Sequence, residues 1–336
     1  MSSVERRSIA KSTLLAGVGV QEQDPCFSRA PGTPSVTIFL CTYNGERFLA
    51  AQLASIEQQS HQNWRLIVSD DHSADATLAI LRHFAQRVSQ PVEIREGPRR
   101  GHAANFLSLA TDPSITDDYF AFCDQDDVWH RDKLSRALTW AQSVPQALPT
   151  VYGGRTTVVC AAGKPLGYSR RFFRPPSFGN ALVQSIAGAN TMLFNRATKR
   201  LFEEAGRVEV TAHDWWAYQL VIGSGGIVGY DPVAYLDYRQ HSANSIGSNR
   251  GLRAQRKRVQ QVLKGRFRDW NETNLAALRS ARHLLTDEAR ALIDVFEVMR
   301  KGSLAERLKA FTTSPLRRQT LVGNIALFAA TALRKV

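Results

Sequence analysis

The sequence predicts an α/β fold built on a mostly parallel, doubly wound sheet flanked by helices, followed by a basic helical C-terminal region. Three observations lead to this prediction. Short apolar runs typical of buried strands alternate with amphipathic helical patterns from about residue 36 onward. Polar clusters follow the strands and precede the helices. Residues 250–336 carry nineteen Lys and Arg but only seven Asp and Glu, in sequence of helical periodicity.

The expected elements follow one another in the order strand, polar cluster, helix. A helix beginning near Phe48 follows the first strand, and a helix with apolar residues as far as Phe84 follows the second. Ligands of such sheets bind outside the carboxyl ends of the strands, so the polar clusters are expected to form one site. The expected strands are 36–40, 65–68, 92–94, 119–123, 192–194 and 226–230.

The most informative cluster is Asp124-Gln125-Asp126-Asp127, directly after the apolar run 119–123. Carboxylates delivered by a buried strand make an oxygen-rich site where a divalent cation and a phosphate can meet. The alternative is a surface turn in which the side chains bond only to nearby backbone.

Two further clusters follow the first and second strands. The first runs from Cys41 to Glu46 and contains Asn44-Gly45, which in isolation is an ordinary turn. The second runs from Ser69 to Thr77 and contains Asp75, which in isolation is a helix cap. Gly97, Gly101 and Asn105 come after the third strand.

These motifs resemble the inverting nucleotide-sugar transferases of glycosyltransferase family 2, which have the GT-A type fold. The resemblance rests on Thr42-Tyr43-Asn44-Gly45, on the segment 70–77 and on the Asp124–Asp127 tetrad followed by Val128-Trp129. The stretch 122–129, with Lys133-Leu134 after it, looks most like the rhamnosyltransferase-like branch. The resemblance covers about residues 36–247.

The resemblance implies roles for the residues in these motifs. Thr42, Tyr43 and Glu46 match residues that hold base and ribose, and Asp71 matches the carboxylate that reads a uracil or thymine edge. Asp124 and Asp126 match the ends of a D-x-D motif that binds Mg²⁺ or Mn²⁺. The nucleotide-binding set is Thr42, Tyr43, Asn44, Glu46, Asp71, Ser73, Asn105 and Asp124, and the set expected near the acceptor or the donor sugar is Gln125, Asp127, Trp129, Asn190, His213, Trp215, Trp216 and Arg239.

The resemblance places the catalytic base at Asp214, in His213-Asp214-Trp215-Trp216. An inverting transfer needs a single carboxylate, which takes the acceptor proton as the hydroxyl attacks the anomeric carbon. The alternative for Asp214 is a helix N-cap before an aromatic core stripe. Trp215 and Trp216 are either a platform for a sugar face or core residues.

The segment 238–244 resembles the stretch that closes over the donor. His241 is expected to supply a nitrogen ligand to the cation, and Arg239 is expected to meet the diphosphate. The alternatives are a solvated histidine and a surface arginine. The Gln-x-x-Arg-Trp signature of processive synthases is missing, so we expect addition of one or a few sugars.

The resemblance implies transfer of a sugar, such as rhamnose from dTDP-rhamnose or another dTDP- or UDP-linked sugar. The expected acceptor is a saccharide or lipid-linked saccharide in the synthesis of a surface polysaccharide such as O-antigen. Two alternatives stay open: a cation-dependent nucleotidyltransferase, which releases pyrophosphate, and an inactive sugar- or nucleotide-binding homologue.

Charge and cysteine usage bear on location and partners. The net charge of +13 lies mostly after residue 250, where aromatic residues for base stacking are sparse, so no nucleic acid is expected. An anionic membrane surface is the better partner. The apolar stretch 321–333 is too short to cross a bilayer and suits either a helix in the interface or a buried helix. Four scattered cysteines fit a reducing, cytoplasmic setting. The basic charge adds the expectation of peripheral contact with the cytoplasmic face of the inner membrane.

The expected organisation has a catalytic core with an appendage at each end. Residues 1–33 are expected to be a mobile tail, and residues 34–249 a GT-A domain with a nucleotide half at 34–127 and an acceptor half at 128–249. Residues 250–336 are the expected basic helical region, including helical sequence at 253–263 and 275–285.

Overall fold

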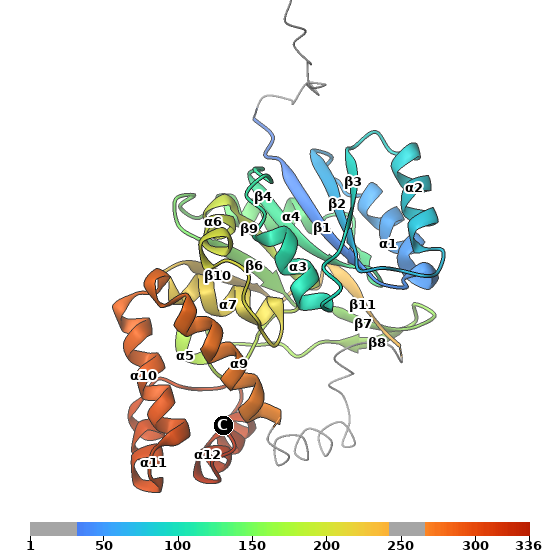
Figure 1. The fold of residues 1–336 in the computed structure, drawn as a ribbon. Coiled ribbons are helices and arrows are strands. Elements are labelled where there is room, and N and C mark those ends of the chain that lie inside the picture. Colours follow the sequence, from blue (N-terminus) through green and yellow to red (C-terminus); the bar gives the residue numbers. More distant parts are fainter. Residues whose placement is uncertain (1–31, 242–265) are drawn as a thin grey trace, which may run out of the picture. The chain divides into compact units, whose positions relative to one another are not determined.

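A computed structural model describes residues 32–241 and 266–336, and residues 34–336 form one compact unit. A seven-stranded sheet runs through this unit in the order β10-β6-β9-β4-β1-β2-β3 (Figure 1). Neighbouring strands from β4 to β3 are parallel, as are β10 and β6, whereas β9 is antiparallel to both of its neighbours. The predicted mostly parallel sheet flanked by helices is confirmed. Its strands are β1 Val36–Thr42, β2 Trp64–Asp70, β3 Val92–Glu96, β4 Tyr119–Asp124, β6 Thr150–Gly154, β9 Leu193–Asn195 and β10 Ile227–Asp231.

Each face of the sheet carries its own layer of helices. Ile38 and Leu40 of β1 face α1, α2 and α4, whereas Phe39 between them faces α3, α6 and α7 (Figure 1). This alternation is the two-residue period of a strand that is buried on both faces. The helices are α1 Glu46–Glu57, α2 Thr77–Arg87, α3 His102–Ala110, α4 Lys133–Gln142, α5 Phe178–Ala181, α6 Arg196–Ala205 and α7 His213–Gly223, with the 3₁₀ turn η1 at Ala189–Thr191.

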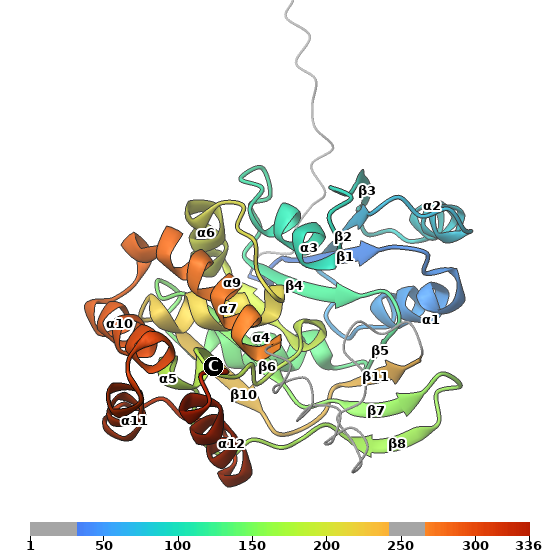
Figure 2. The ribbon, with the colours of Figure 1, turned by 60° about the horizontal axis from the view of Figure 1, so that its bottom comes forward.

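A second, four-stranded sheet lies beside the carboxyl end of β4 (Figure 2). Its order is β5-β11-β7-β8, with β5 Val128–Trp129 directly after the Asp tetrad and β11 Leu236–Gln240 paired to it. The remaining strands are β7 Thr157–Cys160 and β8 Pro165–Tyr168. This sheet brings the end of β11 back to the tetrad, which the sequence pattern did not predict.

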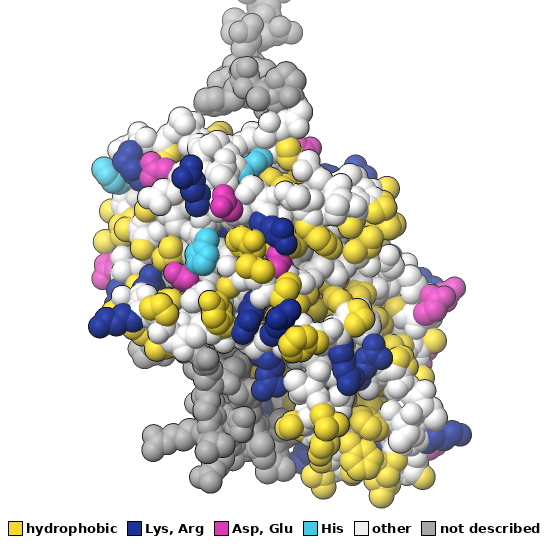
Figure 3. All heavy atoms as spheres, turned by 180° about the vertical axis from the view of Figure 1, so that it is seen from behind, with side chains coloured by type: hydrophobic (Ala, Val, Ile, Leu, Met, Phe, Trp, Pro, Cys, Tyr) yellow, Lys and Arg dark blue, Asp and Glu magenta, His cyan; other side chains and the backbone are white. Residues whose placement is uncertain are grey.

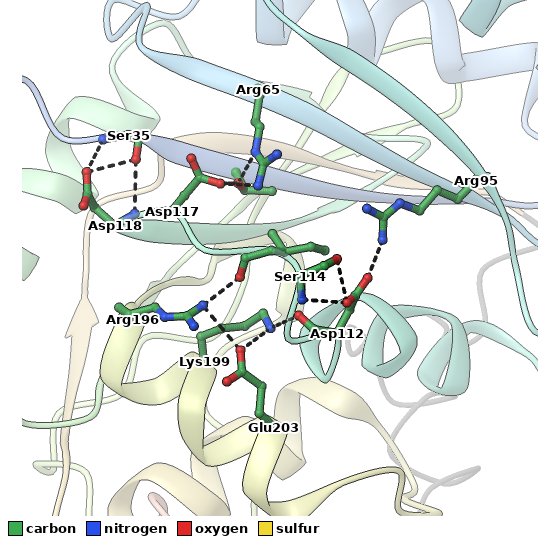
Figure 4. Close-up of polar contacts among 12 residues, drawn as sticks. Ser35, Arg65, Arg95, Asp112, Ser114, Asp117, Asp118, Arg196, Lys199 and Glu203 are labelled. Atoms are coloured by element: carbon green, nitrogen blue, oxygen red, sulfur yellow. Dashed lines mark hydrogen bonds and ion pairs between the residues drawn. The ribbon is translucent and has the colours of Figure 1, made fainter. Parts of the chain in front are cut away.

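The amino ends of the strands are closed by polar contacts that take no part in the proposed site (Figure 4). Asp118 accepts hydrogen bonds from the backbone and side chain of Ser35, at 2.7 and 2.9 Å. The buried Lys199 on α6 donates to the carbonyl oxygen of Asp112 and to Glu203, at 2.6 and 2.7 Å. These contacts fix the edge opposite the site.

The C-terminal helices share the core of the sheet. Leu275 and Leu278 of α9 belong to the same buried cluster as Trp216 of α7, and Asn274 accepts a hydrogen bond from the Thr211 backbone at 3.2 Å. The expected helix at 275–285 divides between α9 and η2, and the expected helix at 253–263 and the boundary near residue 250 lie outside the described residues. The elements are α9 Arg266–Ser280, η2 Arg282–Leu284, α10 Asp287–Lys301, α11 Leu304–Thr313 and α12 Leu321–Ala332. Within 32–241 and 266–336, no helix has the length and apolar character needed to span a bilayer.

Candidate active site

The carboxyl ends of β1, β2 and β4 meet at one edge of the sheet. Thr42 pairs with Asp70, and Cys41 pairs with Asp124, in the parallel register. Burial, and then the charges of Asp124 and Asp71, raises the pKa of the Cys41 thiol, so both carboxylates lie near the end of β1. The polar clusters expected to converge therefore do so.

Hydrogen bonds join the loop after β1 to the loop after β2. The Thr42 hydroxyl donates to Asp70 at 2.7 Å, and the Ser73 hydroxyl accepts from the Asn44 backbone at 2.8 Å. The Asn44 side chain in turn accepts from the Ala74 backbone at 2.8 Å, while its own φ of 47° is a left-handed value that asparagine tolerates well. The hydroxyls of Thr42 and Ser73 both bond to Asp70, and Ser73 also bonds to Asn44, so these residues shape the expected nucleotide pocket together.

Glu46 also joins the two loops. Its carboxylate accepts from the Ala76 backbone at 3.0 Å, and its own backbone N–H donates to Asp75 at 3.1 Å. Asp75 further accepts from the Thr77 backbone at 3.0 Å, but the N-cap of α2 is Ala76, so Asp75 lies one residue before the cap. The Tyr43 ring is 59% exposed and is open to stacking by a base.

Gln125, the second residue of the Asp124–Asp127 tetrad, bonds to the backbone of Tyr43. Its side-chain oxygen accepts from the Tyr43 N–H at 2.9 Å, and its amide group donates to the Tyr43 carbonyl at 3.0 Å. A Cβ on Gly45 would overlap this amide, which explains the glycine at that position. Gln125, expected near a sugar, is thus engaged in positioning the loop after β1.

Asp71 connects the end of β2 to the loop before α3, and Asn105 connects α3 itself to β2. The Asp71 carboxylate accepts from the backbone N–H groups of Arg99 and Gly101, the latter at 3.2 Å. A carboxylate has about four lone-pair sites, so Asp71 retains capacity to accept from a base. Asn105 is buried and both ends of its amide bond to Ser69, which leaves it a structural contact to β2 and no open edge for a nucleotide.

Four carboxylates gather beyond the end of β4. Burial raises the pKa of Asp124 well above its usual value, and the charges of Asp127, Asp126 and Asp214 raise it further. Burial and the charge of Asp126 raise the pKa of Asp127 to about 7, although Asp127 accepts hydrogen bonds from Asn190 and from the Arg239 N–H. Such mutual repulsion marks a site that a cation would stabilise.

The end of β11 supplies the other side of this cluster. His241 Nε2 lies 2.7 Å from Asp126 Oδ2, and Arg239 Nε donates to the Asp126 carbonyl at 2.9 Å. The Phe48 ring lies under both side chains, with its centroid 4.8 Å from that of His241 and 4.9 Å from the Arg239 guanidinium carbon. Phe48 was predicted only as a helix residue; its place two residues after the first polar cluster was the available signal.

Asp214 lies in the first turn of α7, whose N-cap is Ala212, so the N-cap alternative for Asp214 is wrong. Its carboxylate accepts from the Trp215 N–H at 2.7 Å, and burial raises its pKa to about 6. Asp214 therefore combines a place in the acidic cluster with the basicity that suits a general base.

The aromatic residues near Asp214 are core residues. Trp216 is fully buried, and the Trp215 indole donates to the Ala181 carbonyl at 2.6 Å. His213 is buried with its ring stacked on Phe106 at 4.1 Å between centroids, and burial lowers its pKa well below the usual value. These placements favour a core role for the two tryptophans over the alternative of a platform for a sugar face.

Trp129 is likewise buried, and the Lys133 ammonium lies 3.6 Å from the centroid of its ring. Trp129 was expected near the acceptor or the donor sugar, but its burial favours a core position. Lys133 was quoted in the resemblance without an assigned role. Asp70, which accepts from Thr42 and from both the backbone and side chain of Ser73, was quoted in the motif but not singled out. Its role in joining the loops after β1 and β2 is seen only from these hydrogen bonds and not from the sequence.

The oxygen and nitrogen atoms beside the end of β4 fit a hard divalent cation that takes its remaining ligands from a phosphate. Among residues 32–241 and 266–336, no three His, Cys, Asp or Glu side chains are arranged to hold a metal ion by themselves. Asp126 and His241 are in contact, and Asp124 lies close enough for the Asp126 charge to raise its pKa. Oxygen and imidazole ligands suit Mg²⁺ or Mn²⁺, and Mg²⁺ in particular completes its shell with water and substrate phosphates.

Comparison with known proteins agrees with this geometry. Residues 37–202 match the family model described as glycosyl transferase family 2. Over 235 residues the chain is 26% identical to the dTDP-rhamnosyl transferase RfbG of Shigella flexneri, covering 66% of this chain and 78% of that protein. It is also 26% identical over 225 residues to the putative teichuronic acid biosynthesis glycosyltransferase TuaG of Bacillus subtilis, covering 65% of this chain and 83% of that protein.

A solved structure shares the fold. The crystal structure of S. aureus TarS 1–349 in complex with UDP-GlcNAc has a TM-score of 0.51 and 13% identity, covering 89% of this chain and 90% of that one. At this identity the likeness concerns the fold alone, and the family assignment rests on the sequence match. The chain belongs to glycosyl transferase family 2, and it is a glycosyltransferase with the GT-A type fold.

Proposed function

We propose that this glycosyltransferase moves a sugar from a nucleoside diphosphate to a saccharide acceptor with inversion at the anomeric carbon. The observation that carries the proposal is the gathering of Asp124, Asp126, Asp127 and Asp214 beyond the end of β4. The pKa values of Asp124, Asp127 and Asp214 are raised, and an arrangement of this kind is typical of a site built for a cation and for proton transfer.

Asp214 is the proposed base. Because its pKa is raised to about 6, its carboxylate is mostly ionised at neutral pH yet more basic than an ordinary aspartate. The acceptor hydroxyl gives its proton to Asp214 as its oxygen bonds to the anomeric carbon. The bond from that carbon to the diphosphate oxygen breaks on the opposite face, and no second carboxylate acts as nucleophile.

Asp124, Asp126 and His241 are the proposed holders of Mg²⁺ or Mn²⁺. When bound there, the cation supplies charge stabilisation to the departing nucleoside diphosphate. Arg239 is the proposed contact to the same diphosphate. Its guanidinium donates to the carbonyls of Asp126 and Ala161, and these bonds keep it beside the tetrad.

Tyr43 and Asp71 are the proposed contacts to the base, and a dTDP-linked deoxysugar such as rhamnose is the proposed donor. The exposed Tyr43 ring supports stacking, and the 26% identity to a protein named dTDP-rhamnosyl transferase supports this donor. A saccharide or lipid-linked saccharide of a surface polysaccharide, such as O-antigen, is the proposed acceptor. Transfer would take place in the cytoplasm, where nucleotide sugars are made.

A donor screen tests the proposal. Thermal shift with dTDP-rhamnose and with UDP-, GDP- and other dTDP-sugars, with and without Mn²⁺, identifies the base and sugar that stabilise the protein. We expect the largest shift with a dTDP-sugar in the presence of Mn²⁺. Release of nucleoside diphosphate and a product of inverted anomeric configuration, read by NMR, are then expected. Release of pyrophosphate from a nucleoside triphosphate would instead identify a nucleotidyltransferase.

A further inference from the structure

Helix α12 presents an apolar face to solvent. The exposed fractions are 73% for Leu321, 75% for Val322, 61% for Ile325, 43% for Phe328 and 59% for Leu333, just past the helix end. We call these five residues the α12 face. Isolated exposed apolar side chains are common on proteins, but four on one short helix and a fifth directly after it form a patch that marks an interaction surface.

The opposite side of α12 anchors it to the rest of the molecule. Leu327, Ala330 and Thr331 are buried there. At the edge of the α12 face, Phe328 also contacts Phe311 of α11, with centroids 5.4 Å apart. The Thr320 hydroxyl caps the helix by accepting from the Gly323 N–H at 3.0 Å. The helix is therefore fixed in an orientation that leaves the α12 face outward.

The surroundings of the α12 face are strongly basic. Residues 301–336 contain seven Lys and Arg and a single acidic residue, Glu306, so this segment carries a net charge of +6. Arg317-Arg318 precede the helix and Arg334-Lys335 follow it. Figure 3 shows hydrophobic side chains gathered on the C-terminal helices with Lys and Arg side chains beside them.

We propose that the α12 face docks on an anionic phospholipid bilayer, with the helix lying in the plane of the interface. Apolar side chains flanked by cations match a surface that offers acyl chains beneath negative headgroups. A helix of 12 residues is about 18 Å long, too short to cross the roughly 30 Å hydrocarbon core. A second copy of the chain fits poorly, since two such faces would bring like charges of +6 together.

The test uses the full chain and flotation with vesicles. We expect binding to vesicles of phosphatidylglycerol and phosphatidylcholine, weak binding to phosphatidylcholine alone, and release at high salt. Ile325→Glu should lower the partition coefficient tenfold or more, because it places a charge in the apolar contact. The double change Lys309→Gln and Lys335→Gln should lower it about thirtyfold for anionic vesicles only, from about 1 kcal/mol per cation.

Leu166→Glu on β8 is the matched control, because it adds the same charge at a side chain that is 51% exposed and remote in sequence from α12. It should leave binding unchanged, and unchanged melting transitions will show that the variants fold. Equal binding to both vesicle types, binding indifferent to Ile325→Glu, or no binding to either would overturn the proposal. A dimer in light scattering that Ile325→Glu dissociates would assign the face to a second copy instead. None of the active-site carboxylates lies on α12, so this test is independent of the proposed transfer.

Discussion

Asp214 shows how a single side chain acquires its chemistry from its surroundings. Burial makes its carboxylate more basic, while the hydrogen bond from the Trp215 N–H favours the ionised form, and the pKa settles at about 6. An aspartate in open water would have a lower pKa and be a weaker base. A buried aspartate without this hydrogen bond would have a higher pKa and stay protonated to a higher pH.

Replacing Asp214 with Asn should therefore remove the proposed base without removing the donor pocket. We expect kcat to fall 10²- to 10⁴-fold, the usual contribution of general base catalysis, with the donor affinity nearly unchanged. Nucleoside diphosphate release measures the first quantity and thermal shift with donor and Mn²⁺ the second. Asp132→Asn, at an exposed position before α4, is the control. Retained turnover in Asp214→Asn would assign the base to another residue.

The pH dependence of activity follows from the same pKa. Because the base must be ionised, kcat/KM should rise with pH through an inflection near 6 and level off above pH 7. At pH 5 the ionised fraction is about a tenth, so activity should be roughly tenfold below the plateau. Initial rates measured from pH 5 to 8 at saturating Mn²⁺ test this, and a flat profile would argue against Asp214.

At the scale of elements, the loop after β1 depends on a side chain from the end of β4. Gly45 permits this contact, since a Cβ there would overlap the Gln125 amide that bonds both backbone groups of Tyr43. The backbone at Gly45 has φ of −97°, so alanine is excluded by the neighbouring side chain and not by backbone strain.

Gly45→Ala should accordingly displace Gln125 and loosen Tyr43, raising the donor KM on the order of tenfold, since two hydrogen bonds of about 1 kcal/mol each are lost in part. The same change made in a Gln125→Ala background should have little further effect, because the overlapping amide is already gone. This double-mutant cycle is read from donor KM and from melting temperature. Additive effects of the two changes would show that Gln125 does not mediate the effect.

The sequence predicted the strands and helices that deliver the site, but not the bonds that their side chains make. Apolar runs and polar clusters indicated that Asp71, Asp124 and the loop after β1 would meet at one edge, and they do. The side-chain amides of Gln125 and Asn105, expected to contact the substrate, donate to backbone carbonyls instead. These bonds join segments that are distant in the sequence, so the sequence pattern could not show them. The second sheet was missed because strands such as β5, with two residues, are too short to show a period.

At the scale of the whole molecule, the active site is kept at a cost in stability. Asp124 and Asp127 have raised pKa values in the folded protein, so folding takes up protons between the ordinary aspartate pKa of 3.8 and these higher values. Unfolding is then easier as pH rises through that window, because these two carboxylates lose their protons in the folded protein. The buried histidine His213 acts in the opposite sense, since its lowered pKa makes unfolding easier as pH falls below 6.5.

Comparing the protein with its Asp124→Asn variant separates the two effects, because His213 is common to both. With chelator present, the variant lacks the charge at this position that Asp127, Asp126 and Asp214 repel, so it should melt at a higher temperature than the unaltered protein at pH 8. The difference should shrink towards pH 5, where protonated aspartate resembles asparagine in shape and charge. Melting temperatures of both proteins across this range give the measurement, with Asp132→Asn expected to show no pH-dependent difference.

Addition of Mn²⁺ and a nucleoside diphosphate at pH 8 should reverse this difference, so that the unaltered protein melts at a higher temperature than Asp124→Asn. The unaltered protein gains free energy of unfolding from ligands that bind only its folded state, by about 2.7 kcal/mol at a hundred times the Kd. The variant gains less, because it has lost one of the carboxylates proposed to hold the cation. If Asp124→Asn is less stable than the unaltered protein at pH 8 in chelator, the carboxylates do not repel one another as inferred. If Mn²⁺ stabilises both proteins equally, Asp124 does not contribute to the cation site.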